Sequence, residues 1–196
     1  MKLLAAASTI FAMTALTACQ SSTETAEAAW TTLFDGTSLD GWTPVGNAMW
    51  DLADGAVSGS ATEGNGYLVS RDSYGDFELQ VEFWVDEPAN SGVFLRCQDT
   101  SAITADNAYE VNIYDTRPDP AYRTGSIVNV AEPAVSINAG GQWNTFDILA
   151  QGPHLVVKLN GTQTVDTMDS KHAMGPIALQ YGAGVVKFRS VKIRTL

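Results

Sequence analysis

The chain has 196 residues, with 11 basic and 22 acidic side chains and a formal net charge of −11 at pH 7. This length suits one sizeable domain and is too short for two comfortable ones. A chain this acidic repels nucleic acid and anionic lipid headgroups, which argues against both as partners and leaves neutral ligands such as sugars open.

Residues 1–18 predict a secretory signal, because one lysine precedes an apolar, alanine-rich run that is too short for a spanning helix. The run ends in LTAC at residues 16–19, which resembles the bacterial lipobox, in which the cysteine is lipidated and becomes the new N-terminus. Residues 19–29 are small, polar and acidic, as in a flexible tether. We expect lipidation at Cys19 and anchoring by the lipid alone, on the outer membrane facing the periplasm, because Gln20 follows the cysteine. The alternative is a plain signal peptide in which the cysteine has no role.

Residues 30–196 predict an all-β domain, because strand patterns recur between turn residues and no long stretch shows the apolar rhythm of a helix. The clearest strand is at residues 77–85, where apolar and polar side chains alternate. Further strands are predicted within residues 93–97, 109–114, 143–152, 155–165, 177–181 and 185–193, with Asn160-Gly161 as a hairpin turn. With Cys19 committed to the lipid, Cys97 has no disulfide partner, so the core alone must hold the fold. The prediction is a two-sheet antiparallel sandwich of the jelly-roll type.

The polar faces of these strands are expected to form a single outer surface. Its predicted members are Gln80, Glu82, Trp84, Arg96, Glu110, Asn112 and Gln180. Aromatic rings can cover the C–H faces of a sugar while amides, carboxylates and a guanidinium bind its hydroxyls, so the set suits a polyhydroxylated ligand. Asn90 and His172 are further candidates for substrate binding, although a loop position explains His172 equally well. The alternative reading of the whole set is an ordinary solvated sheet face.

The strand at residues 109–113 has an unusual polar face. Glu110 and Asn112 lie side by side on it, and Asp115 follows just beyond. Isolated acidic residues have low strand propensity, so the arrangement suggests a functional role. The same alternation places Val111 in the core. We therefore expect Val111→Asp to unfold the domain and Asn112→Ala to leave its melting temperature nearly unchanged.

Several segments together resemble one bacterial family, the former domain of unknown function 1080, described as 3-keto-disaccharide hydrolases or 3-keto-glucoside lyase/hydratases. The matching segments are LFDGTSLDGW (33–42), YGDFELQVEFWV (74–85), NSGVFLR (90–96), YEVNIYD (109–115), GQWNTFDI (141–148), LNG (159–161), GPIALQYG (175–182) and VKFRSVKIRTL (186–196). They span nearly the entire domain in the family's order. The resemblance implies a concanavalin A-like jelly roll that acts on oxidised glycosides.

The sequence departs from the family pattern in two places. Asn112 stands where the family commonly has glutamine, and Tyr181 follows Gln180 where many members have an acidic residue and then histidine. The second change removes a candidate acid, base or metal ligand. The metal requirement of the family is therefore not carried over to this chain, and the sequence itself offers no support for a divalent metal.

The resemblance implies cleavage by elimination. A ketone at C3 of a sugar acidifies the C2 proton, so a base can remove it, the glycosidic oxygen at C1 can leave, and hydration of the enone completes the hydrolysis. This route needs a base near C2, donors to the enolate oxygen and a proton for the leaving group. We expect Glu110 to be the base, Arg96 the enolate stabiliser and Asn112 a positioning amide. Asp115 is expected to act as a second carboxylate or to position Arg96 or Arg123 through an ion pair. The alternative without a catalytic role is a salt bridge between Glu110 and Arg96 within the sheet.

Two other functions remain open. Glu110, Asn112 and Asp115 have the spacing of the ExDxxE signature of jelly-roll retaining glucanases, but a regular strand sends the two carboxylates to opposite faces, and that mechanism needs them about 5 Å apart. A non-catalytic carbohydrate-binding module on a lipid tether has the same fold.

No strand is followed by GxGxxG and a helix, so nothing in the chain binds a nicotinamide or flavin cofactor. The C3 ketone must then come from a separate sugar 3-oxidoreductase acting upstream. The expected partner is a small-molecule 3-keto-glycoside or oligosaccharide.

Overall fold

The structure is a computed structural model that describes residues 28–196. The predicted signal at residues 1–18 and the lipidation site Cys19 lie outside the described residues, as does most of the tether. No helix in the described residues is long and apolar enough to cross a membrane.

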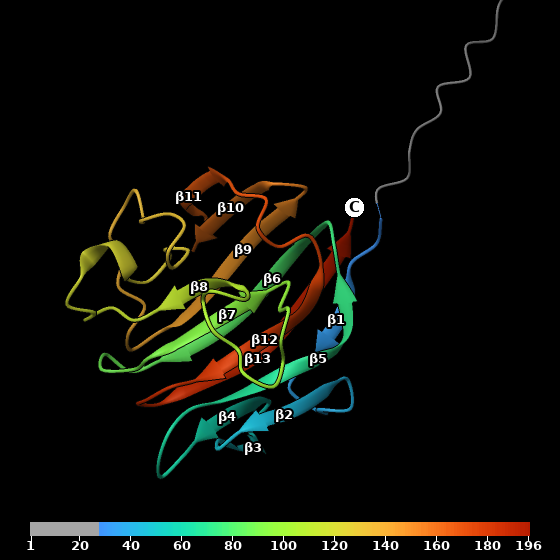
Figure 1. Cartoon of the computed structure of the whole chain (residues 1–196). Coiled ribbons are helices and arrows are strands. Elements are labelled where there is room, and N and C mark those ends of the chain that lie inside the picture. Colours follow the sequence, from blue (N-terminus) through green and yellow to red (C-terminus); the bar gives the residue numbers. More distant parts are fainter. Residues whose placement is uncertain (1–27) are drawn as a thin grey trace, which may run out of the picture.

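Two antiparallel sheets form the domain, packed as two layers (Figure 1). Sheet A contains β1 (Thr31–Phe34), β3 (Met49–Ala53), β4 (Ala56–Ser60), β6 (Phe77–Val85), β9 (Trp143–Gln151), β10 (His154–Leu159), β11 (Thr162–Met168) and β13 (Val186–Thr195). Sheet B contains β2 (Trp42–Gly46), β5 (Gly66–Tyr74), β7 (Ser91–Leu95), β8 (Tyr109–Ile113) and β12 (Gly175–Tyr181). A 3₁₀ turn at Pro120–Tyr122 is the single helical element of the described residues. The predicted all-β jelly-roll sandwich is confirmed.

The strand order explains how distant segments meet. Sheet A runs β11-β10-β9-β6-β13-β4-β3, with β1 also paired to β13, and sheet B runs β2-β5-β12-β7-β8. The predicted hairpin turn at Asn160-Gly161 joins β10 to β11, and both of its residues have positive φ (52° and 80°). No strand is predicted from the sequence before residue 77, whereas β1 to β5 precede it. Of these strands, β2 and β3 were missed because they are largely exposed and lack a clean alternation.

The core lies between the two sheets and follows from the two-residue period of the strands. On β6 every second residue from Phe77 to Val85 is buried, and the residues between them are half-buried on the outer face. Phe83 of β6 packs against Phe146 of β9 with ring centroids 4.8 Å apart. Sheet B contributes Tyr109, Val111 and Ile113 of β8 to the same core.

The predicted single polar surface is wrong, because its members belong to two different sheets. Gln80, Glu82 and Trp84 lie on β6 in sheet A, whereas Glu110 and Gln180 lie on β8 and β12 in sheet B. The inner faces of the two sheets meet in the core, so their outer faces point in opposite directions. Alternation along a strand tells which side chains point outward, but it does not tell which sheet the strand joins.

Two connecting segments cover the outer face of sheet B. Residues 98–108, between β7 and β8, form the yellow-green loop of Figure 1. Ile103 of this loop belongs to a small apolar cluster with Phe94 and Ala178. Residues 114–131 run along the free edge of β8 and hydrogen bond to its backbone, as from the Val128 N–H to the Glu110 carbonyl at 3.0 Å. The polar residues of this face are therefore largely buried.

Candidate functional site

The outer face of sheet B brings together four polar side chains, which we call the Glu110 cluster: Tyr67, Glu110, Asn112 and Gln180. Gln180 on β12 pairs with Tyr67 on β5, and Asn112 on β8 pairs with Gly92 on β7. The pairing of β12 with β7 places Gln180 beside Gly92, so the row crosses four strands. Glu110 lies in the next row, opposite Phe94.

Gly92 leaves room for the Phe94 ring. A Cβ atom at this position would lie 3.4 Å from Cγ of Glu110 and 3.3 Å from the Phe94 ring. The contact with the Phe94 ring would be tight, whereas the contact with Cγ of Glu110 would be an ordinary van der Waals contact. A glycine here therefore lets the Phe94 ring lie close to the backbone of β7.

Glu110 has the properties of a base that works near neutral pH. Burial raises the pKa of its carboxyl from an ordinary 4.5 to about 7, against the opposing effect of the positive charge of Arg117. Within residues 28–196 no hydrogen bond or ion pair holds this half-buried carboxylate, so it is free to accept a proton from a ligand. Its negative charge also adds to the rise in the pKa of the Tyr67 phenol, which is caused mainly by burial.

Two amide oxygens of the cluster are buried without a partner. Asn112, at 0 % exposure, donates its Nδ2 hydrogen to the Tyr122 carbonyl, and Gln180 donates from Nε2 to the Tyr67 hydroxyl at 3.3 Å. Oδ1 of Asn112 and Oε1 of Gln180 accept no hydrogen bond. Buried unpaired acceptors are uncommon, and any hydroxyl or water donor that reached them would satisfy them. The full burial of Asn112 also removes the basis for expecting Asn112→Ala to be neutral.

Arg117 is the cation whose charge acts on Glu110, and the sequence interpretation missed it. Its guanidinium lies over the rings of Tyr114 and Tyr122, at 5.9 and 5.4 Å from their centroids. Two aromatic faces fix a guanidinium without using its hydrogen-bond donors. The segment Tyr114–Tyr122, with an arginine between two tyrosines, was the signal available in the sequence.

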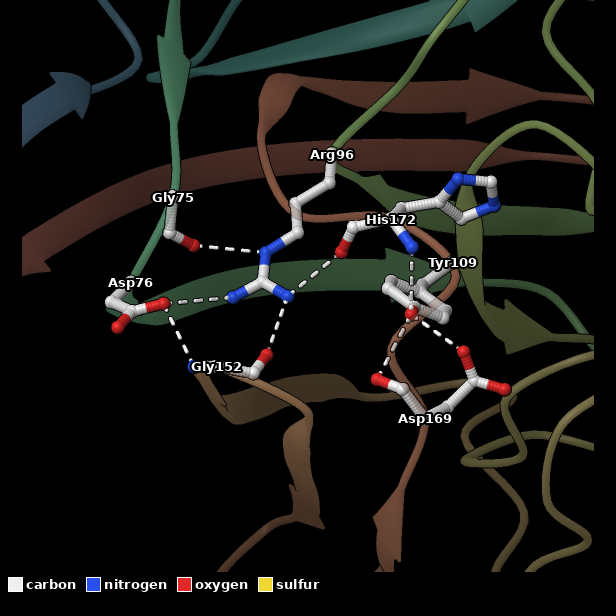
Figure 2. Close-up of polar contacts among 7 residues, drawn as sticks. All are labelled: Gly75, Asp76, Arg96, Tyr109, Gly152, Asp169 and His172. Carbon is white, nitrogen blue, oxygen red and sulfur yellow. Dashed lines mark hydrogen bonds and ion pairs between the residues drawn. The ribbon is translucent and has the colours of Figure 1, made fainter.

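Arg96 does not belong to this cluster. It directly follows β7 with a positive φ of 53° and is fully buried. Figure 2 shows its guanidinium pointing toward the backbone of Gly75, Gly152 and His172. Its Nε donates to the Gly75 carbonyl at 2.9 Å, Nη1 to the carbonyls of Gly152 (2.8 Å) and His172 (3.0 Å), and Nη2 pairs with Asp76 at 3.2 Å. All three nitrogens are committed, so neither the enolate-stabilising role nor a salt bridge with Glu110 fits this position.

Asp115 also has a structural position. Its Oδ1 accepts from the Thr124 hydroxyl at 2.5 Å, and its Oδ2 accepts from the backbone N–H groups of Ala139 and Gly140, both at 2.8 Å. The carboxylate therefore links the segment after β8 to the loops at Thr124 and Ala139, and it pairs with neither Arg96 nor Arg123. Its commitment leaves Glu110 without the second free carboxylate that a retaining glycosidase needs.

The remaining candidates lie apart from Glu110 or at its margin. The His172 ring packs edge-on against the Tyr109 ring at 5.0 Å, its backbone N–H donates to the Tyr109 hydroxyl, and Figure 2 places it at the Arg96 end. Burial lowers the pKa of His172. Asn90 precedes β7 and joins its backbone to that of Ala183, just past the end of β12.

The three candidates on β6 are held by partners on the outer face of sheet A. Gln80 donates to Asp147 at 2.9 Å, Glu82 pairs with Arg189 at 2.5 Å, and the Trp84 ring lies 5.7 Å from Lys187 Nζ. This arrangement is that of a solvated sheet face, the alternative considered from the sequence. Among residues 28–196, no three His, Cys, Asp or Glu side chains lie together in a way that would hold a metal ion.

Comparison with known proteins gives the family. The model of the 3-keto-alpha-glucoside-1,2-lyase-like domain matches residues 29–194. The chain belongs to this family. The resemblance seen in the sequence is thereby confirmed.

One curated relative is the 3-keto-disaccharide hydrolase of Bacteroides thetaiotaomicron, whose sequence is 28% identical to this chain over 149 residues. The alignment covers 60% of this chain and 51% of the relative, so the chain spans about half the length of that protein.

Solved structures support the fold of this family member. A Parabacteroides distasonis protein provisionally assigned as a glycosyl hydrolase superposes with a TM-score of 0.71 at 26% identity, covering 86% of this chain and 100% of that one. The carbohydrate-binding module CBM66 of Bacillus subtilis gives a TM-score of 0.61 at 16% identity, covering 87% and 98%. The second likeness shows the fold alone.

Proposed function

We propose that this chain cleaves 3-keto-glycosides by elimination and hydration. Glu110 takes the C2 proton, and the C2–H electron pair forms an enolate with the C3 oxygen. Return of that pair expels the glycosidic oxygen from C1 and leaves a C1=C2 double bond conjugated with the C3 ketone. Water then adds, with its hydroxyl on C1 and a proton on C2. The observation that carries the proposal is the uncommitted, half-buried carboxylate with a pKa of about 7.

The other groups of the cluster have parts in the same reaction. Arg117, whose guanidinium lies over two tyrosine rings, supplies the positive charge that acts on Glu110 and takes the role first expected of Arg96. The unpaired oxygens of Asn112 and Gln180 are buried, so they would accept hydrogen bonds from sugar hydroxyls once the segments that cover them move aside. Glu110, once protonated, is the acid available to the leaving oxygen. The C3 ketone comes from a separate sugar 3-oxidoreductase, because C2 of an unoxidised sugar is not acidic.

The test replaces the base and keeps its shape. Glu110→Gln should lower turnover of a 3-keto-glycoside by about 10² or more while binding persists, because the amide lacks basicity. Solvent deuterium should exchange into C2 with the wild-type protein and far more slowly with the variant. Glu82→Gln, on the outer face of sheet A, is the matched control and should keep full turnover.

Two results would overturn this role. Full activity of Glu110→Gln without C2 exchange would remove Glu110 as the base. Efficient cleavage of ordinary glucosides by the wild-type protein would favour the glucanase mechanism instead.

A non-catalytic carbohydrate-binding module is the second candidate function. The observation that favours it is the pair of unpaired amide oxygens, which can bind hydroxyls without any reaction. Such a module would bind both oxidised and unoxidised sugars in the assay above and release no product from either.

We also propose that the mature protein is an exported lipoprotein anchored through Cys19. The support is the residue pattern of the first 19 positions.

A further inference from the structure

A surface groove lies on the outer face of sheet A, on the side of the sandwich away from the Glu110 cluster. It has a volume of about 330 Å³. Its apolar lining includes Trp30, Leu149 and Val156, and its polar lining includes Asp147, Lys158 and Gln163. We call it the Trp30 groove. None of these residues has a part in the reaction proposed above.

The wall of the groove is a tryptophan, one face of which lies against an arginine. Trp30 directly precedes β1, whose first residue pairs with Ile193 on β13. The guanidinium of Arg194, also on β13, lies 5.4 Å from the centre of the Trp30 ring and pairs through Nε with Glu78 at 2.7 Å. The ring is thus fixed at the edge of the groove, yet 45% of Trp30 remains exposed. Large exposed aromatic side chains beside a groove commonly mark a binding site.

The floor and rim of the groove complement this wall. Leu149 and Val156 give an apolar floor next to the ring. Strand register places Lys158 opposite Asp147 on β9 and opposite Gln163 on β11, so an ammonium, a carboxylate and an amide form one row. The charge of Asp147 faces that of Lys158, and Glu78 is paired with Arg194. The groove therefore has no large excess of either charge and suits a neutral ligand.

These features together define a chemical class of ligand. An aromatic ring covers the C–H face of a sugar, the rim offers donors and acceptors to its hydroxyls, and the volume is that of a small-molecule site. We propose that the Trp30 groove is a second, non-catalytic binding site for a neutral saccharide. Because the outer faces of the two sheets point in opposite directions, a sugar held here cannot reach Glu110. The site would attach the protein to a glycan. Saccharide binding there does not depend on the reaction proposed for Glu110.

The test follows the Trp30 indole signal by NMR, with the whole chain carrying Cys19→Ser so that no lipid can be attached. Neutral glucose and xylose oligosaccharides should shift this signal, which Trp30→Phe identifies by its absence. Trp30→Ala should weaken binding by about tenfold or more, through loss of the aromatic platform, and Trp30→Phe by less. Trp143→Ala is the matched control, since Trp143 is 37% exposed on the same face but does not line the groove. It should leave binding unchanged.

Turnover of a small soluble 3-keto-glycoside separates this site from the catalytic proposal. Trp30→Ala should weaken saccharide binding at the Trp30 groove and keep that turnover, whereas Glu110→Gln should keep this binding and lose turnover. The proposal is overturned if no neutral oligosaccharide shifts the Trp30 signal, or if Trp30→Ala binds as well as the wild type. It is also overturned if a peptide of residues 19–29 shifts the signal and the sugars do not, since the groove would then bind the chain's own N-terminal segment.

Discussion

Burial raises the pKa of the Glu110 carboxyl from 4.5 to about 7, and the first consequence at the residue scale is a pH-dependent rate. Elimination needs the deprotonated carboxylate, so kcat/KM for a 3-keto-glycoside should rise with pH along a limb whose apparent pKa is near 7. A pH–rate profile of the wild-type protein measures this limb. A limb near pH 4 to 5 would mean that the base is a solvated carboxylate and not Glu110.

The same carboxyl should make folding stability depend on pH in the opposite sense. Because its folded pKa lies above its unfolded value, the folded state holds the proton more tightly, and this stabilisation is complete below about pH 4.5 and lost as pH rises through about 7. Glu110→Gln cannot ionise, so its stability relative to wild type should increase between pH 4.5 and 8, by at most about 3 kcal/mol. Urea unfolding of both proteins at several pH values measures the difference. A difference that does not change with pH would contradict the burial of this group.

At the scale of elements, Arg96 joins three connections that are distant in sequence. Its guanidinium binds the β5–β6 turn at Gly75 and Asp76, the β9–β10 turn at Gly152, and the loop before β12 at His172. Arg96→Met should leave these carbonyls buried and unpaired, and should lower the free energy of unfolding by about 3 kcal/mol or more.

A second arginine provides the control for this prediction. Arg189 pairs with Glu82 on the solvated face of sheet A, so Arg189→Met should cost no more than about 1 kcal/mol. Denaturant unfolding compares the two variants. Equal losses in the free energy of unfolding would contradict a structural role for Arg96. An Arg96→Met protein that keeps its stability but loses turnover would instead support a catalytic role for this residue.

At the scale of the whole molecule, the two outer faces of the sandwich are expected to serve different purposes. The Glu110 cluster is covered by residues 98–108 and 114–131, whereas sheet A exposes paired charges and the Trp30 groove. The predicted tether leads into Trp30, so anchoring would leave both faces in the same compartment.

Membrane attachment can be tested without reference to catalysis. Cys19→Ser should move the protein from the membrane fraction to the soluble fraction, because a single cysteine carries the expected lipid. Fractionation with immunodetection measures the distribution. Unchanged membrane retention would contradict the lipobox interpretation.

The alternation of polar and apolar residues by itself determined the all-β class, the β6 strand and the outward direction of Glu110, and the Asn160-Gly161 pair determined the hairpin. These features are local, because the direction of a strand side chain follows from the two-residue period. The tertiary structure alone decided that Glu82 and Glu110, with the same local pattern, lie on opposite faces, since strand pairing links segments far apart in the chain. It also decided that Arg96 turns into the interior, and that two connecting segments bury Glu110 and raise its pKa. Burial and charge depend on contacts made across the whole fold, which no short stretch of residues encodes.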